Sequence, residues 1–119
     1  MNLYKPLYHP NFFKRLKKKG VASWKSRLQE AVREILADPY KARYKKLGKK
    51  YRYDYRGKSS YKLGSSERII YMICEECMND REDYQINLAH TCSNYCKVQS
   101  SKETIIFLAF GSHKEVLGV

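Results

Sequence analysis

Four cysteines in the second half of the chain have the spacing of a metal site. Two residues separate Cys74 from Cys77, and after a further 14 residues Cys92 and Cys96 follow with three residues between them. Thiolates are soft ligands and tetrahedral Zn²⁺ accepts four of them, so the pattern follows the logic of two zinc knuckles, although two spacings fall just outside the common four-cysteine range. Four thiolates leave no open position for a water molecule. The expected Zn²⁺ is therefore structural and not catalytic.

Two disulfides or free thiols are the alternatives to zinc. The sequence shows no apolar core of signal-peptide length and no apolar span of about 20 residues, which predicts a cytoplasmic protein without a membrane segment. Thiols are kept reduced in the cytoplasm, and this favours metal over disulfides. The polar connection that carries the cysteines is longer than an ordinary hairpin loop. Residues 74–103 are therefore predicted to form an insertion that metal binding orders.

Basic and aromatic residues make a second constellation. Residues 41–62 contain ten Lys/Arg, five tyrosines and a single acid. Of the net charge of +12, residues 1–66 hold 19 Lys/Arg against 4 Asp/Glu (+15), and residues 67–119 hold 5 against 8 (−3). Basic side chains contact phosphates and tyrosine rings stack on unpaired bases, so the segment predicts an RNA-binding surface, with a solvated loop as the alternative. The residues expected to contact RNA are Lys45, Lys46, Lys49, Lys50, Arg52, Arg56, Lys58 and Lys114.

Three further residues, Lys62, Arg68 and His113, have the side chains that cleavage of RNA requires. Histidine titrates near neutrality and can act as base or acid, arginine presents a fixed fork of donors to a phosphate, and lysine is a mobile positive charge. Residues of these types at strand ends are often only surface residues. The prediction of a catalytic site therefore depends on the elements that would bring the three together.

Two apolar runs, residues 68–74 and 104–110, are the elements that must do so. Both are rich in β-branched and aromatic residues, and their apolarity is continuous, which predicts two strands that are covered on both faces. Neighbouring strands in the sequence usually pair. An antiparallel pair would place Arg68 beside residues 111–114 and the cysteines at the other end of the ladder.

The rest of the chain predicts the other elements. Residues 3–8 suit a short first strand, residues 11–19 and 21–35 have apolar positions at helical spacing that end at Asp38-Pro39, and residues 60–63 suit a strand followed by a tight turn at 64–66. The 119 residues therefore predict a single α+β domain. In this domain a helical hairpin packs on a small twisted, mainly antiparallel sheet, with a zinc-knuckle-like insertion between the last two strands.

The order of these motifs resembles the RelE/ParE superfamily of type II toxin-antitoxin toxins. The resemblance covers all of the chain except the cysteine insertion. It rests on Ile35-Leu36-Ala37-Asp38-Pro39, Lys46-Leu47-Gly48, Tyr61-Lys62-Leu63, Arg68-Ile69-Ile70-Tyr71 and Phe110-Gly111-Ser112-His113-Lys114-Glu115-Val116.

The resemblance to the RelE branch implies an mRNA interferase, an endoribonuclease that cleaves mRNA in the ribosomal A site without a metal ion. Carried over by position, Lys62 matches a catalytic lysine, Arg68 the arginine that stabilises the transition state, and His113 the arginine or histidine that follows the last strand. The implied partners are a cognate antitoxin protein, the ribosome and mRNA.

Two other functions stay open. The ParE branch implies a toxin that binds DNA gyrase, for which the basic residues need perform no chemistry. Leu117 stands where the family has a tyrosine, which favours a third possibility, a zinc-stapled nucleic-acid-binding module of the same fold without catalysis.

Overall fold

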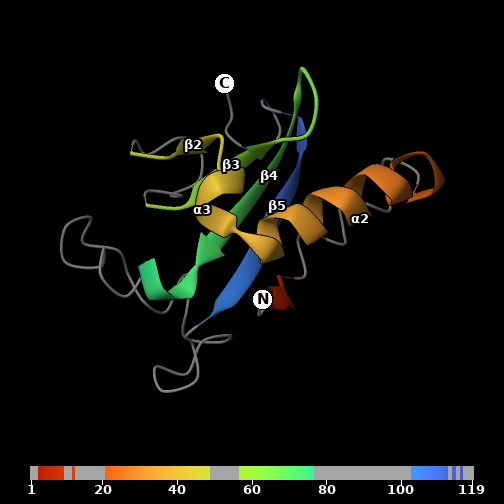
Figure 1. Ribbon diagram of the computed structural model, residues 1–119. Helices are drawn as coiled ribbons and strands as arrows, with labels where there is room; N and C mark the ends of the chain where they lie inside the picture. Colours follow the sequence, from red (N-terminus) through yellow and green to blue (C-terminus); the bar gives the residue numbers. More distant parts are fainter. Residues whose placement is uncertain are drawn as a thin grey trace.

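The computed structural model describes residues 3–9, 12, 21–48, 57–76, 103–112, 114 and 116. These residues form an α+β fold whose five-stranded sheet has the order β1-β5-β4-β3-β2 (Figure 1). The elements are β1 (Lys5–Tyr8), α2 (Val21–Ala37), α3 (Pro39–Ala42), β2 (Lys45–Lys46), β3 (Ser59–Lys62), β4 (Glu67–Ile73) and β5 (Thr104–Ser112). Because β1 runs parallel to β5 and the other three pairings are antiparallel, the sheet is mixed but mainly antiparallel, as predicted.

The antiparallel ladder between β4 and β5 forms the centre of the sheet. Its register pairs Arg68 with Gly111 at one end and Ile73 with Ile105 at the other, with a β-bulge after Ile70. This confirms the predicted pairing of the two apolar runs. Apart from Glu67 and Ser112 at its ends, every residue of the two strands is buried.

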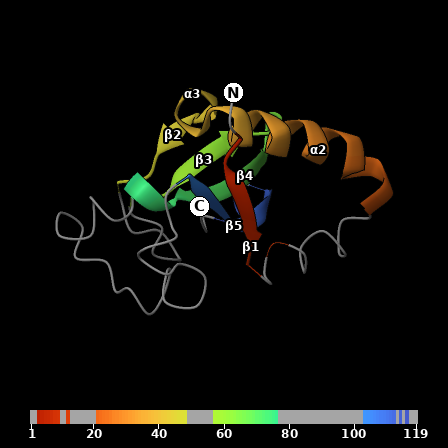
Figure 2. The ribbon, with the colours of Figure 1, turned by 60° about the horizontal axis from the view of Figure 1, so that its bottom comes forward.

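Two apolar clusters cover the two faces of this ladder. Successive residues of a strand point to opposite faces, so each strand contributes to both clusters. On one face, shown from the edge in Figure 2, lies helix α2; the cluster there includes Leu28, Ala31, Ile35, Ile69, Tyr71, Ile73, Ile105, Phe107 and Phe110. The cluster on the opposite face contains Leu47, Ile70, Met72, Cys74, Ile106, Leu108, Ala109 and Val116. The predicted burial of both faces is confirmed.

Helix α2 follows the predicted periodicity. Leu28, Ala31 and Ile35 are spaced by three and four residues and are buried against the sheet, whereas most residues between them are exposed. The first helix of the predicted hairpin lies outside the described residues except for Phe12, which is helical and buried. The structure therefore bears out the second helix of the hairpin and leaves the first as a prediction.

The sequence Asp38-Pro39 ends one helix and also begins another. Proline lacks an N–H group to continue α2, but it suits the first turn of a helix. The side chain of Asp38 caps α3 by accepting a hydrogen bond from the backbone N–H of Lys41 at 3.1 Å. The hydroxyl of Tyr71 donates to the carbonyl oxygen of Pro39 at 2.6 Å, which fixes α3 to β4. Burial raises the pKa of Tyr71 above its ordinary value, so the hydroxyl stays protonated and remains a donor.

Strand β2 was not predicted from the sequence. Its two residues, Lys45 and Lys46, have no strand-like side-chain pattern, yet they pair with Ser60 and Ser59 of β3. The pairing continues through the backbone, because Leu47 and Lys58 share a 2.8 Å hydrogen bond and Gly57 donates to the carbonyl oxygen of Leu47. None of the described helices combines the length and apolarity needed to cross a lipid bilayer.

Replacing Tyr71 with Phe should remove the bond that ties α3 to the sheet. The substitution leaves the buried carbonyl oxygen of Pro39 without this donor, so we expect the free energy of unfolding to fall by about 1–3 kcal/mol. The matched control is Tyr61→Phe, which removes the more exposed bond of Tyr61 to Glu34 and should change stability by less than about 0.5 kcal/mol. Urea unfolding of both variants measures the difference; equal losses would show that the Pro39 contact is unimportant.

Candidate nucleic-acid interface

The sheet brings two of the three predicted catalytic residues together. Lys62, the last residue of β3, is the cross-strand partner of Arg68 near the start of β4, and side chains of such partners share one face of the sheet. On the other side of Arg68 stands Gly111 of β5, which has no side chain to fill that face. The side chain of His113 lies outside the described residues, one position beyond the end of β5.

The guanidinium group of Arg68 is held in place by the backbone around it. Its Nη1 donates to the carbonyl oxygens of Glu67 at 3.0 Å and Gly64 at 3.4 Å, and the residue is only 9% exposed. The same turn is bound from α2, because Nη2 of Arg27 donates to the carbonyl oxygen of Leu63 at 2.6 Å. A guanidinium with fixed orientation loses little freedom when it binds a phosphate.

An exposed aromatic ring lies beside these two cations. Nζ of Lys62 is 5.3 Å from the centre of the Tyr44 ring, and Cζ of Arg68 is 5.5 Å from it, both within cation–π range. The backbone N–H of Tyr44 donates to the carbonyl oxygen of Ser60 at 2.9 Å, which places the ring next to the end of β3. Tyr44 is nevertheless 57% exposed. The sequence analysis included Tyr44 among the five tyrosines of residues 41–62, but no sequence feature distinguished it from the other four as a site residue.

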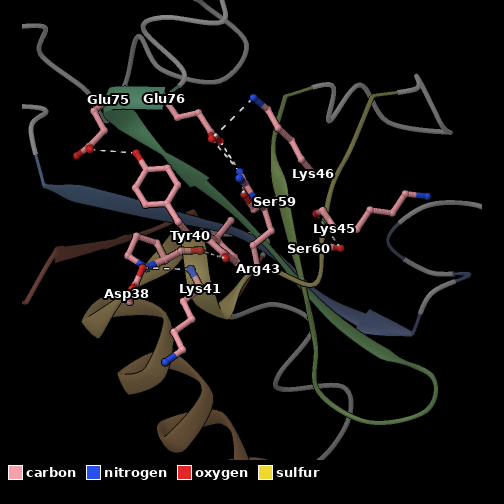
Figure 3. A network of polar contacts seen from close by, with 12 residues as sticks. Asp38, Tyr40, Lys41, Arg43, Lys45, Lys46, Ser59, Ser60, Glu75 and Glu76 are labelled. Carbon is pink, nitrogen blue, oxygen red and sulfur yellow. Dashed lines mark hydrogen bonds and ion pairs between the residues drawn. The ribbon is translucent and has the colours of Figure 1, made fainter.

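The opposite end of the sheet also carries basic residues, but there they are neutralised (Figure 3). Nη1 of Arg43 donates to both carboxylate oxygens of Glu76 at 2.8 Å, and Nζ of Lys46 is 3.8 Å from the same carboxylate. Glu76 therefore forms ion pairs with two cations, one of which was expected to contact RNA.

The neighbouring Glu75 joins three separate parts of the chain. Its carboxylate accepts hydrogen bonds from the hydroxyls of Tyr40 at 3.0 Å and Tyr4 at 3.3 Å, and from the backbone N–H of Glu103 at 3.3 Å. Burial, followed by the interaction with Glu75, raises the pKa of both tyrosines above the ordinary value. The two ends of the predicted cysteine insertion, residues 74–103, are thus held together by the Glu75 carboxylate.

The other residues predicted to bind RNA have different positions. Lys45 and Lys114 are exposed, whereas Lys58 is 1% exposed and lies inside the protein. The register of β2 places Lys45 on the same face of the sheet as Lys62 and Arg68, because Ser60 is its partner and pairs in turn with Ile70. Four of the predicted residues lie outside the described ranges: Lys49, Lys50, Arg52 and Arg56.

The structure describes one of the four candidate zinc ligands. Cys74 follows directly after β4, is fully buried, and belongs to the apolar cluster opposite α2. In the described part of the chain no group of three or more potential metal-binding side chains occurs. The remaining ligands, Cys77, Cys92 and Cys96, lie outside it.

Comparison of the chain with models of protein families, with curated proteins and with solved structures gave no match. The site is therefore interpreted from its own geometry and charge.

The two ends of the sheet differ in their net electrostatic character. Within the ranges that the structure describes, no carboxylate forms an ion pair with Lys45, Lys62 or Arg68, while Glu76 pairs with Arg43 and Lys46. Positive charge that is not paired with a carboxylate attracts anions. This arrangement makes the Arg68 end of the sheet, with Lys62 and Tyr44, the candidate binding site for a polyanion, and Lys45 lies on the same face.

Replacing Glu76 with Ala should separate folding from anion binding. The substitution leaves the partly buried Arg43 without its carboxylate, so we expect the free energy of unfolding to fall by about 1–3 kcal/mol. Affinity for RNA should stay the same or rise, because two cations lose their counter-charge. Glu34→Ala is the control, since the Glu34 carboxylate accepts a solvent-exposed hydrogen bond from the hydroxyl of Tyr61. Chemical denaturation and RNA binding measure the two effects, and a loss of RNA affinity in folded Glu76→Ala would contradict the assignment of the site.

Proposed function

We propose that this protein is the toxin of a type II toxin-antitoxin system and inhibits translation by cleaving mRNA on the ribosome. The observation that carries the proposal is the cross-strand pair Lys62 and Arg68. The two cations lie on one face at the end of the sheet where β5 leads to His113, and no carboxylate of the described residues forms an ion pair with them. The resemblance of the motif order to the RelE/ParE superfamily points to the same residues.

The chemistry follows from these side chains. A base removes the proton of a ribose 2′-OH, the oxygen attacks the adjacent phosphorus, and the bond from phosphorus to the 5′-oxygen breaks as an acid protonates the leaving group. The products are a 2′,3′-cyclic phosphate and a 5′-hydroxyl. In our proposal Arg68 stabilises the negative charge of the pentavalent phosphorane, and Lys62 and His113 share the two proton transfers and the binding of phosphate.

The uneven charge of the chain supports the proposed partners. The first 66 residues carry +15, and a field of one sign speeds association with RNA and with acidic proteins. We assign ribosomal RNA and mRNA to this basic part. The partner that silences the toxin is an antitoxin protein, which we expect to be acidic.

One observation favours a second function, nucleic-acid binding without cleavage. Arg68 is largely buried and its Nη1 already donates to two carbonyl oxygens, so part of its donor capacity serves the turn. Under this alternative the basic cluster would hold RNA but leave it intact. A gyrase-binding toxin is a further outcome that the assay below distinguishes.

We also propose one structural Zn²⁺ bound by Cys74, Cys77, Cys92 and Cys96. The donor set is soft and complete for tetrahedral zinc. Cys74 stands at the end of a central strand, and the carboxylate of the adjacent Glu75 accepts a hydrogen bond from the backbone N–H of Glu103, which joins the two ends of the insertion. Because the two ends of the insertion are already held in place, less conformational entropy is lost when the four ligands come together.

Three substitutions test the proposed cleavage. Expression of the wild-type protein should arrest translation and produce cleaved mRNA. Removing a proton donor or a phosphate ligand typically lowers the rate of such a step by about 10²-fold or more. We therefore expect Lys62→Ala, Arg68→Lys and His113→Ala to cleave mRNA on programmed ribosomes at least that much more slowly.

The variants are chosen so that a loss of cleavage is not caused by a loss of folding. Arg68→Lys keeps the charge and removes the fork of donors, and the exposed Lys62 is not required for packing. Cleavage by all three variants at the wild-type rate would defeat the assignment. Intact RNA with induced DNA damage would select the gyrase-binding alternative, and ribosome binding without cleavage would select the non-catalytic one.

Elemental analysis tests the metal proposal. Protein purified under reducing conditions should contain about one Zn²⁺ per chain, following the four-thiolate geometry. Cys96→Ser should lose the metal and unfold at a lower temperature while its rate of RNA cleavage is retained. Cys74→Ser is a less specific variant, because it also places a hydroxyl in the apolar cluster opposite α2. Metal-free wild-type protein would refute the site.

A further inference from the structure

We propose that the ring of Tyr44 is a stacking platform for one unpaired base of RNA, with the phosphate of the same nucleotide held by Lys62 and Arg68. This proposal rests on the assignment of the Arg68 end of the sheet to RNA and deepens it. It states that the site selects single-stranded RNA over duplex RNA.

The first argument is the exposure of the ring. Tyr44 is 57% exposed, and its hydroxyl makes no hydrogen bond to another residue of the described ranges. Tyr40 is also exposed, but its hydroxyl donates a hydrogen bond to Glu75. Tyr44 therefore belongs to neither apolar cluster of the described residues. Its ring is accessible to a ligand.

The second argument is the fixed position of the ring. The backbone N–H of Tyr44 donates to the carbonyl oxygen of Ser60 in β3, and β3 is held in the sheet by its pairing with the central strand β4. Two cations approach the ring to 5.3 and 5.5 Å. A ring that is positioned before the ligand arrives loses little entropy on binding.

The third argument is the combination of ring and charge. Base stacking on aromatic rings tolerates any sequence and needs an unpaired base, while phosphate binding needs cations without a counter-charge. Tyr44, Lys62 and Arg68 supply both within the distances given above. The similar group at the other end of the sheet does not, because the cation over the Tyr40 ring, Arg43, is paired with Glu76.

Binding of fluorescently labelled oligonucleotides tests the proposal without ribosomes. We expect Tyr44→Ala to bind a single-stranded RNA roughly 5- to 100-fold more weakly than the wild type. Its affinity for a duplex of the same sequence should be unchanged, since stacked bases cannot reach the ring. Tyr44→Phe and Tyr44→Trp keep an aromatic ring and should retain the single-strand affinity, which also shows that the position tolerates substitution.

The salt dependence separates the ring from the charges. Each phosphate contact contributes about −0.7 to the slope of log K against log[salt] for single strands. Lys62→Ala should therefore reduce the magnitude of the slope by about 0.7, whereas Tyr44→Ala should lower the affinity at every salt concentration without changing the slope. Tyr40→Ala is the matched control and should bind RNA like the wild type.

Three results would overturn the proposal: wild-type affinity of folded Tyr44→Ala for single strands, equal losses for single strand and duplex, or an equal loss in folded Tyr40→Ala. The outcome is independent of the proposed enzymatic function. Cleavage of mRNA together with wild-type binding by Tyr44→Ala would reject the platform alone. Single-strand binding that depends on Tyr44, without cleavage by the wild type, would reject the nuclease alone.

Discussion

The antiparallel ladder between β4 and β5 is the constraint on which the rest of the fold depends. Both strands are buried on both faces, so their apolar side chains join the cluster under α2 and the cluster opposite it at the same time. Burial of this kind is the main driving force of folding and fixes the register, because a slip of one residue would exchange the faces. The register in turn determines which polar groups stand at each end.

The two ends of the ladder have different physical roles. At the Cys74 end, Glu75 and Glu76 follow the strand and bind tyrosine hydroxyls and cations from elements that are distant in the sequence. These charges are satisfied within the protein and stabilise the fold. At the Arg68 end, the cations have no ion pair with a described carboxylate. A positive field that the fold does not neutralise is available for a ligand.

The arrangement also explains how a strongly basic chain remains compatible with a small core. Arg43 and Lys46 lie near the helix-covered side and are paired with Glu76, which removes their charge from the vicinity of α3. Lys45, the preceding residue of the same strand, lies on the opposite face. Alternation along β2 thus divides adjacent lysines between the two faces of the sheet, one with a structural role and the other with a candidate binding role.

The sequence by itself determined the elements whose pattern is strong: the two central strands, helix α2 and the place of Arg68 beside residue 111. Continuous apolarity and helical spacing are local signals, and they were sufficient because the core is made from these segments. The sequence did not predict β2, α3 or the selection of Tyr44 among five tyrosines. Only the tertiary structure decided these. Two lysines form a strand only when β3 offers backbone partners, and α3 is fixed to the sheet only when the hydroxyl of Tyr71 on β4 reaches the carbonyl oxygen of Pro39. An aromatic ring becomes a candidate ligand contact only when the cations of other strands lie next to it.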